Sequence, residues 1–331
     1  VWYIFCLPRQ LFHVPYSTVV TDRNEELLGA RIASDGQWRF PPRKTTPEKI
    51  KQCLITFEDK HFYHHWGVNP LSTGRALYQN LKNKRVVSGG STLTMQTIRL
   101  ARNKPRTIGE KVIEMIWATR LEFRTSKEEI LSMYVSHAPF GGNVVGLDAA
   151  AWRYFGHSAE DLSWAESAML AVLPNAPAMI HLSKGNRLLK QLFEEEIIDA
   201  STYELAISEP LPDEPHPLPQ IAPHLVTRFY QERNGLYTRS TIDKGIQTHI
   251  ESLAERWSNE FNRSDIRNLA ILIIDIPTNQ VVAYCGNVHF DRKQGGNQVD
   301  VIQAPRSTGS ILKPFLYGAM LQEGSLLPQM L

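Results

Sequence analysis

Two carboxylates stand side by side in the first of two unusual motifs, EDKHFYHHWG at Glu58–Gly67. Glu58 follows the apolar run Leu54–Phe57 and precedes a cluster of histidine and aromatic residues. Because burial disfavours the charged form, a carboxyl group in such a setting has a raised pKa, which suits it to accept a proton from a hydroxyl. Taken alone, however, an adjacent glutamate and aspartate more often cap the following helix.

The second motif, SGGSTLTMQ at Ser88–Gln96, joins a glycine-rich loop to hydroxyl side chains and a basic helix. Glycines let the backbone approach a ligand closely, and the first N–H groups of a helix form a natural anion site. The residues suited to such contacts are Gly89, Gly90, Ser91, Thr92, Gln96 and Arg99. A glycine turn followed by a Ser/Thr cap is also common without any ligand, so the bare GGST string would be weak evidence.

A third stretch, RTIGEKVIEMIW, places Lys111 three residues before Glu114, and residues at this spacing share one face of a helix. Without further context, Glu110 and Glu114 would be taken for a solvated helix face. The segment Lys82–Arg124 contains ten Lys or Arg and three Glu, whereas the rest of the chain contains 26 basic and 31 acidic residues. This contrast favours an anionic ligand about as strongly as it favours a solvated basic surface.

The elements that would position these motifs are mostly helices. The helix signals are the start Thr46-Pro47-Glu48, the capping boxes Ser126/Glu129 and Ser163/Glu166, and the apolar periodicity of Ile108–Phe123. They continue to about Ile207 with little strand signal, whereas the preceding residues 9–44 are mixed and turn-rich. The sequence therefore predicts an all-α domain.

Composition changes at Glu209–Pro223, where six prolines in fifteen residues predict a stiff, extended linker. Beyond it, Asp243–Phe261 predicts a helix, and Ala270–Ile276 and Gln280–Tyr284 predict the two strands of a hairpin. An incomplete α+β domain should therefore follow the α-helical one.

Together these motifs resemble the glycosyltransferase domain of class A (bifunctional) penicillin-binding proteins, glycosyltransferase family 51. The pattern ED-x-x-F-x-x-H-x-G is met by Glu58, Asp59, Phe62, His65 and Gly67. The strings HAPFGGN and DGQWRFP look most like the 1C subgroup of this family. The chain departs from the usual family residues at three positions, with Arg99 in place of Lys, Ser132 in place of Glu and Ser136 in place of Asn. Arginine keeps the charge and adds bidentate phosphate binding, while the two serines lose a carboxylate and an amide.

The resemblance implies a lysozyme-like α-helical transferase that polymerises lipid II processively with inversion at the anomeric carbon. Glu58 would be the general base on the acceptor's 4-hydroxyl, and Glu114 would act on the donor side. Glu114 would help to organise the pyrophosphate or a divalent cation (Mg²⁺ or Mn²⁺) bound to it, and no cofactor would be tightly bound. Substrate contacts are implied for Asp59, His65, Ser91, Thr92, Gln96, Arg99 and Lys111.

A second chemical motif lies near the end of the chain, in RSTGSILKPF. Ser310 and Lys313 form an S-x-x-K pair, in which the lysine amine can accept the serine proton. The flanking residues resemble the nucleophile motif of a serine transpeptidase, of the β-lactamase-like fold. Only 18 residues follow Lys313, and the later S-x-N and K-T-G elements are absent from them. We therefore expect neither acylation nor penicillin binding from this chain.

The resulting division is residues 1–8 as the remnant of a transmembrane anchor, 9–45 as a connecting segment, 46–208 as the transferase domain, 209–240 as a proline-rich linker and 241–331 as the start of a transpeptidase domain. The apolar residues Val1–Leu7 are too few to cross a bilayer, so they could be a buried strand or the end of an anchoring helix, and the resemblance favours the anchor. It implies a single-pass protein of the bacterial inner membrane with its domains on the periplasmic side. The partners would be lipid II, the growing glycan, the inner membrane and cell-wall synthesis proteins, and the net charge of only +2 gives no indication of nucleic acid.

Two alternatives remain. A lysozyme-like lytic hydrolase would use Glu58 as its acid, but an uncharged glycan needs no basic anion site. A non-catalytic wall scaffold would fit the changes at Ser132 and Ser136, whereas retention of Glu58 and Glu114 argues against it. The three cysteines, Cys6, Cys53 and Cys285, are too far apart in sequence to indicate a disulfide framework or a metal site.

Overall fold

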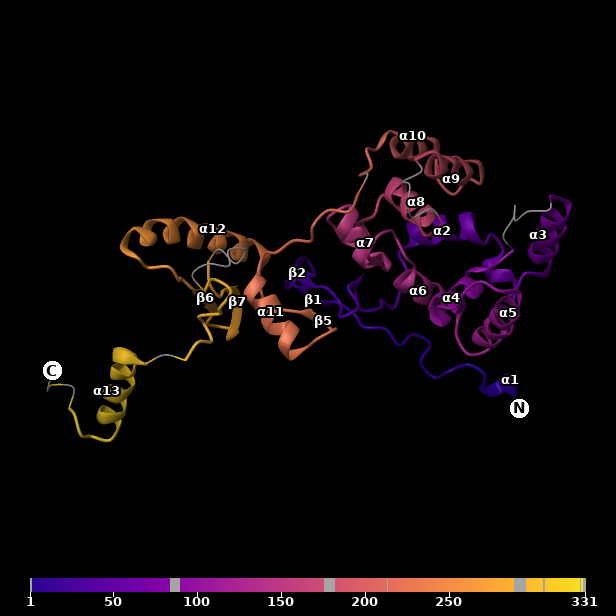
Figure 1. Ribbon diagram of the computed structural model, residues 1–331. Coiled ribbons are helices and arrows are strands. Elements are labelled where there is room, and N and C mark those ends of the chain that lie inside the picture. The colour runs from indigo at the N-terminus through magenta and orange to yellow at the C-terminus, as the bar shows by residue number, and fades with distance from the viewer. Residues whose placement is uncertain are drawn as a thin grey trace.

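The computed structural model describes residues 2–83, 90–175, 182–212, 214–288, 296–305, 307–327 and 329. It is mainly helical, with small sheets (Figure 1). The helices of the first part are α1 (Trp2–Phe5), α2 (Glu48–Glu58), α3 (Pro70–Asn83), α4 (Leu93–Arg102), α5 (Ile108–Glu122), α6 (Lys127–His137), α7 (Leu147–Tyr154), α8 (Trp164–Val172), α9 (Leu182–Glu194) and α10 (Ala200–Ser208). The later helices are α11 (Pro223–Glu232), α12 (Lys244–Phe261) and α13 (Lys313–Gln322).

Most of the predicted helix signals are confirmed. Both capping boxes form, at the starts of α6 and α8, and α5 covers nearly the whole predicted periodic run. The predicted cap at Thr46 is wrong, because α2 begins at Glu48 and Pro47 takes the N-cap position without a side-chain hydrogen bond. The N-terminal residues form the helix α1 rather than a buried strand.

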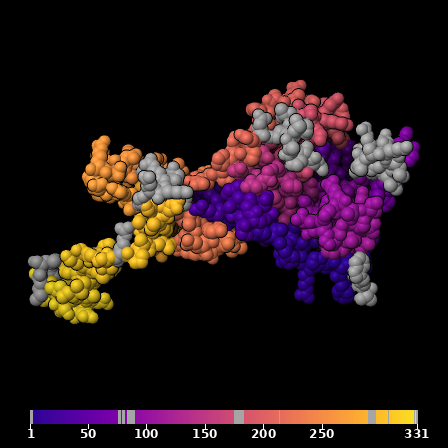
Figure 2. All heavy atoms as spheres, viewed as in Figure 1, coloured from indigo at the N-terminus to yellow at the C-terminus, as the bar shows by residue number. Residues whose placement is uncertain are grey.

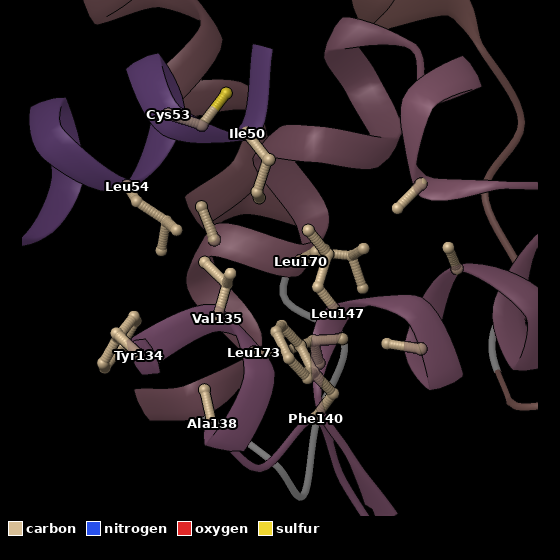
Figure 3. Close-up of a cluster of buried hydrophobic side chains, with 14 of the residues drawn as sticks. Ile50, Cys53, Leu54, Tyr134, Val135, Ala138, Phe140, Leu147, Leu170 and Leu173 are labelled. Carbon is tan, nitrogen blue, oxygen red and sulfur yellow. The ribbon is translucent and has the colours of Figure 1, made fainter. Parts of the chain in front are cut away.

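One main hydrophobic core holds the first part together (Figure 3). Ile50 and Leu54 of α2 meet Val135 of α6 and Leu170 of α8, and all four side chains are almost fully buried. Helix α4 packs against both α5 and α6. The C-terminal end of α2 and the whole of α4, which carry the two motifs, are therefore fixed by buried contacts.

The all-α expectation is wrong in one detail. The short strand β4 (Val144–Val145) pairs in parallel with β3 (Trp38–Arg39). Gly146 follows β4 with φ of +87°, and a Cβ there would lie 2.6 Å from the carbonyl oxygen of Ser136. Only glycine fits this turn, which explains why strand propensity did not predict the strand before it.

The N-terminal segment is also more ordered than predicted. Strands β1 (Thr18–Thr21) and β2 (Leu27–Arg31) are antiparallel, and β5 (Tyr237–Arg239) adds to β1 in parallel. Their sheet packs with α11 in a second small core that includes Val20, Leu28, Ala222, Leu225, Val226, Ile242 and Tyr284. In Figure 2 the indigo N-terminal residues accordingly lie between the magenta helical part and the orange part.

The stretch predicted as a linker therefore contains regular structure. Helix α11 and strand β5 both lie within residues 209–240. The described residues from 209 to the start of α11 belong to neither a helix nor a strand. Pro223 lies in the first turn of α11, where a proline starts a helix rather than breaking it. Proline content alone could not show where the extended segment ends.

The predicted hairpin is confirmed by the antiparallel pair β6 (Ile271–Asp275) and β7 (Gln280–Cys285). The predicted helix is confirmed as α12, with Asp243 as its N-cap, and it packs on β7. Helix α13 projects away from these elements in Figure 1. Among the described residues, no helix combines the length and apolarity needed to cross a bilayer.

Candidate active site

A cavity of about 550 Å³ lies where α2 ends and α4 begins. Its walls come from the end of α2, the start of α3, the loop before α4, and one residue of α9. The lining residues are Thr56, Phe57, Glu58, Asp59, Lys60, His61, Asn69, Leu71, Ser72, Arg75, Gly90, Ser91, Thr92 and Gln191. Residues of both sequence motifs thus line one cavity, which is what a shared chemical role requires.

Glu58 is the last residue of α2 and is largely buried. Burial raises the pKa of its carboxyl group, and the neighbouring Asp59 charge raises it further. Gln96 donates a hydrogen bond from Nε2 to Glu58 Oε2 at 2.8 Å, and this bond together with the charge of Arg99 lowers the pKa in part. The result is a carboxyl group poised above its usual range and held in place by α4.

Tyr134 on α6 completes this support. Its hydroxyl donates to Gln96 Oε1 at 3.5 Å, so the amide of Gln96 is oriented with its N–H₂ toward Glu58. Burial first, and the Glu58 charge second, raise the pKa of Tyr134, which keeps the phenol protonated as a donor.

Asp59 and His65 form a buried pair beneath the cavity. His65 Nε2 donates to Asp59 Oδ2 at 2.9 Å, and the same oxygen accepts the backbone N–H of Leu93, the first residue of α4, at 3.1 Å. Asp59 lines the cavity and His65 does not. The pair thus ties the first motif to the helix of the second, and its contact with substrate stays a prediction.

Thr92 is the N-cap of α4 and is buried. Its hydroxyl accepts the N–H of Met95 at 3.1 Å and donates to the carbonyl oxygen of Gly67 at 2.6 Å. Gly67 has φ of +82°, and a Cβ there would lie 2.5 Å from the carbonyl oxygen of Ala118. Thr92 therefore positions the loop end and the helix start, as the predicted helix N-terminus requires. Ser88 and Gly89 of the motif lie outside the described residues.

Arg99 and Glu114 form a bidentate ion pair between α4 and α5. Arg99 Nε and Nη2 each lie 3.0 Å from an oxygen of Glu114, and Nη2 also donates to Ser91 Oγ at 3.0 Å. The Glu114 side chain is only 8% exposed and that of Arg99 is 24% exposed. Within the described part of the chain, Arg99 Nη1 has no hydrogen-bond partner, so it remains available to an anion.

Lys111 lies one turn before Glu114 on α5 and is exposed. It makes no ion pair with any residue that the structure describes. The spacing predicted from sequence thus puts a free cation on the helix that carries Glu114, although no described contact joins the two side chains.

Metal binding can be tested against the same geometry. Both oxygens of Glu114 are already engaged by Arg99. Across the described ranges, no group of three or more His, Cys, Asp or Glu side chains could hold a metal ion. A cation at Glu114 would have to displace the guanidinium, so the residues in this arrangement do not fit one.

The two serines that depart from the family pattern have structural partners. Ser132 Oγ donates to the carbonyl oxygen of Arg43 at 2.6 Å, and Ser136 Oγ accepts the Arg43 N–H at 3.3 Å. The Arg43 side chain is in turn paired with Asp148, at 2.9 Å, and with Glu160. The changes at these positions therefore affect packing beside α6, and neither serine lines the cavity at the end of α2.

Ser310 and Lys313 lie apart from all of these residues. Ser310 is in a short 3-10 turn, Gly309–Leu312, and Lys313 begins α13. Both are exposed, and no hydrogen bond between them is found in the described structure. No desolvated serine–lysine pair is assembled here.

Sequence reasoning missed several residues of the cavity. Lys60 forms an ion pair with Glu195 just beyond α9, Asn69 Oδ1 accepts the N–H of Ser72, and Arg75 projects from α3. Arg75 lies outside both motifs and has no described ion-pair partner. Only the basic character of the wider region could have suggested Arg75. The basic segment defined from the sequence begins at Lys82 and therefore leaves Arg75 out.

Comparisons with known proteins identify the family of this chain. Residues 25–198 match the family described as Transglycosylase. Penicillin-binding protein 1C of Escherichia coli is 35% identical over 330 residues, which cover 97% of this chain and 43% of that protein. Penicillin-binding protein 1A of Pseudomonas aeruginosa is 32% identical over 258 residues, which cover 73% of this chain and 30% of that protein.

A solved structure, penicillin-binding protein 1A from Haemophilus influenzae, aligns with 76% of this chain and 31% of its own. The sequence identity is 16% and the TM-score is 0.34, too low to carry an argument about the fold. The chain spans less than half the length of each of these three relatives.

The family match covers more than half of the chain and includes both motifs, Lys111 and Glu114. Penicillin-binding proteins of other bacteria match it as well, including protein 1B of Escherichia coli at 28% identity over 86% of this chain. The chain therefore belongs to the transglycosylase family and carries the peptidoglycan transglycosylase domain of class A penicillin-binding proteins.

Proposed function

We propose that this chain polymerises lipid II by inverting transfer from a polyprenyl-pyrophosphate donor to the 4-hydroxyl of an acceptor sugar. The observation that carries the proposal is the shared use of α4. One face of this helix holds Glu58 through Gln96 and, one turn on, holds Glu114 through Arg99. A proton acceptor and an anion-binding guanidinium are thereby fixed relative to each other.

Glu58 is the general base in this mechanism. Its ionised carboxylate takes the proton of the acceptor hydroxyl as the oxygen attacks the anomeric carbon of the donor. The bond between that carbon and the pyrophosphate oxygen breaks, and the pyrophosphate leaves with the electron pair. The raised pKa of Glu58 brings its basicity closer to the working pH, which favours proton transfer.

Cations would stabilise the negative charge that develops on the leaving pyrophosphate. Arg99 is the central one, because Glu114 and Ser91 orient its guanidinium and leave Nη1 for a phosphate oxygen. Lys111 on α5 and Arg75 on the cavity wall are further candidates for phosphate contact. In this mechanism Glu114 acts by holding the guanidinium of Arg99 in place.

The finer assignments follow the same proposal. The first part would be a lysozyme-like transferase domain over residues 46–208, and residues 241–331 would be the start of a transpeptidase domain in a longer, membrane-anchored envelope protein. The exposed Ser310 and Lys313 fit a nucleophile motif that needs further structure to become active.

The direct test is the variant Glu58→Gln with lipid II as substrate. It keeps the size of the side chain and its contact with Gln96 but removes the base, so polymer formation should fall by at least about 100-fold, while binding of lipid II stays within about twofold. Glu204→Gln, an exposed residue of α10, is the matched control and should retain full activity. Polymer formation near the wild-type rate by Glu58→Gln would refute the base assignment, and release of fragments from mature peptidoglycan by the unaltered chain would show a hydrolase instead.

A further inference from the structure

A second cavity lies under the N-terminal segment. It is separate from the cavity beside Glu58, hereafter the transferase cavity. It has a volume of about 420 Å³, within the usual range of ligand sites, and shares no lining residue with the transferase cavity. Its walls come from residues 7–11, from Arg43 and Lys44, from the end of α5, and from α6. Two of these walls belong to segments about 115 residues apart in sequence, joined by hydrogen bonds from Arg124 to the carbonyl oxygens of Pro8 and Arg9.

The cavity carries excess positive charge. Arg9 and Lys44 are exposed at its mouth and have no ion-pair or hydrogen-bond partner for their side chains within the described ranges. Among the residues that the structure describes, the Arg124 side chain is bound to backbone carbonyls and to no carboxylate, which leaves its charge uncompensated there. The one carboxylate is Glu129, which is held by the N–H and hydroxyl of Ser126 in the capping box. The cavity lining therefore carries three uncompensated cations and a single carboxylate, which already accepts two hydrogen bonds.

Arg43 does not add to this excess. Its guanidinium is neutralised by Asp148 and Glu160, and its carbonyl oxygen is bound by Ser132. It lines the cavity beside Lys44 as a side chain whose charge is already compensated.

The rest of the lining is apolar. Leu7 and Leu121 are buried, and Leu11 and Met133 are packed against the main core. A free inorganic anion would leave this surface uncovered, whereas an anion attached to a hydrocarbon chain would cover it. The combination of cations at the mouth and leucines inside fits an anionic amphiphile.

Apolar side chains around the cavity are exposed as well. Ile4 and Phe5 of α1 are 57% and 77% exposed, and α1 rests on α5 through a hydrogen bond from Tyr3 to Thr119 (Figure 1). Phe123, next to Arg124, is 61% exposed. Basic residues bordered by exposed aromatic and aliphatic side chains are typical of contact with the interface of an anionic membrane.

We infer that this cavity binds the headgroup and first acyl carbons of an anionic glycerophospholipid, with Arg9, Lys44 and Arg124 around the phosphate. Binding would fasten the N-terminal segment to α5 and α6 by giving both walls a common ligand. The site is distinct from the transferase cavity and does not depend on the mechanism proposed for it.

The test is calorimetric titration of the 331-residue chain with three soluble probes: dihexanoyl-phosphatidylglycerol, dihexanoyl-phosphatidylcholine and glycerol 1-phosphate, all below micelle-forming concentrations. Only the first should bind measurably, because it alone has both the net negative charge and the acyl chains. Equal binding of phosphatidylcholine would overturn the role of charge, equal binding of glycerol phosphate would overturn the role of the acyl chains, and no binding of phosphatidylglycerol would overturn the proposal as a whole.

Variants then locate the site. The double variant Arg9→Gln/Lys44→Gln should weaken phosphatidylglycerol binding about 10- to 30-fold, since each cation contributes about three- to fivefold. Lys184→Gln/Arg187→Gln on α9 removes the same charge from another exposed surface and should leave affinity within about twofold. An equal loss in the control pair would place binding elsewhere and overturn the inference. Circular dichroism checks that each variant is folded, which the exposure of the substituted residues favours.

Discussion

Removal of the Arg99 side chain should destabilise the contact between α4 and α5. Arg99→Ala leaves Glu114 buried and without its bidentate partner. Loss of one member of a fully buried ion pair costs about 3–5 kcal/mol. The Arg99 side chain is 24% exposed, so water can reach part of the site, and we expect a loss of about 2–3 kcal/mol.

Two companion variants separate charge from geometry. Arg99→Lys keeps the cation but offers a single nitrogen in place of the planar fork, so it should lose only about 1 kcal/mol. The double variant Arg99→Ala/Glu114→Ala removes both charges, so its loss should be smaller than the sum of the two single losses by about 1–3 kcal/mol. That coupling is the energy of the pair within this site.

Hydrogen exchange read by mass spectrometry is the suitable assay, because a chain of this size with two cores need not unfold in one step. Amides of α4 and α5 should exchange faster in Arg99→Ala, while those of α12 and β7 serve as an internal reference. Lipid II binding, measured in parallel, should weaken in Arg99→Ala and recover largely in Arg99→Lys. Unchanged protection in α4 and α5, together with additive energies in the double variant, would refute the proposal that Glu114 acts by holding Arg99.

Two further predictions concern the base and the loop below it. The rate of polymerisation should rise with pH as Glu58 loses its proton, and Gln96→Leu should move this rise to higher pH, because it removes the hydrogen bond that lowers the Glu58 pKa. A pH–rate profile measures the shift, and a move to lower pH would contradict it. Gly67→Ala should prevent folding of the first part, because its Cβ would lie 2.5 Å from the carbonyl oxygen of Ala118. Gly36→Ala is the control, since Gly36 also has a positive φ, +75°, but nothing lies within 4 Å of a Cβ there. It should cost about 1–2 kcal/mol in unfolding free energy, so similar melting curves for the two variants would contradict the steric argument.

The helices could be predicted because their signals are local. Ser126 and Glu129 satisfy each other's backbone within one turn, and a pattern of that length is visible in the sequence. The pairing of β1 with β5 could not be predicted in the same way, because its partners are more than 200 residues apart. The four residues of β1 and the three residues of β5 carry no local pattern that shows which distant segment each strand pairs with.

The candidate site shows the same limit. Residue types and spacing placed Glu58, Gln96, Arg99 and Glu114 correctly in one region, but they did not show which of them contact one another. Asp59 lines the cavity, and its carboxylate also accepts hydrogen bonds from His65 and from the first N–H of α4, which the sequence did not show. An aspartate that accepts hydrogen bonds in the interior and an aspartate that binds a ligand are the same residue type in the sequence, so only the packed structure distinguishes them.

The two ends of α4 therefore have different tasks. At its start, Asp59 and Thr92 accept N–H groups that would otherwise be available to an anion, which leaves this helix N-terminus less able to bind phosphate than the GGST string suggests. Farther along, Arg99 is held by two side chains, and its Nη1 has no hydrogen-bond partner among the residues that the structure describes. Phosphate recognition should accordingly depend on the guanidinium of Arg99 and neighbouring cations more than on the helix dipole. This is why the substitution of Arg99 should affect lipid II binding strongly, whereas Thr92→Val should act mainly through the stability of the loop and helix start.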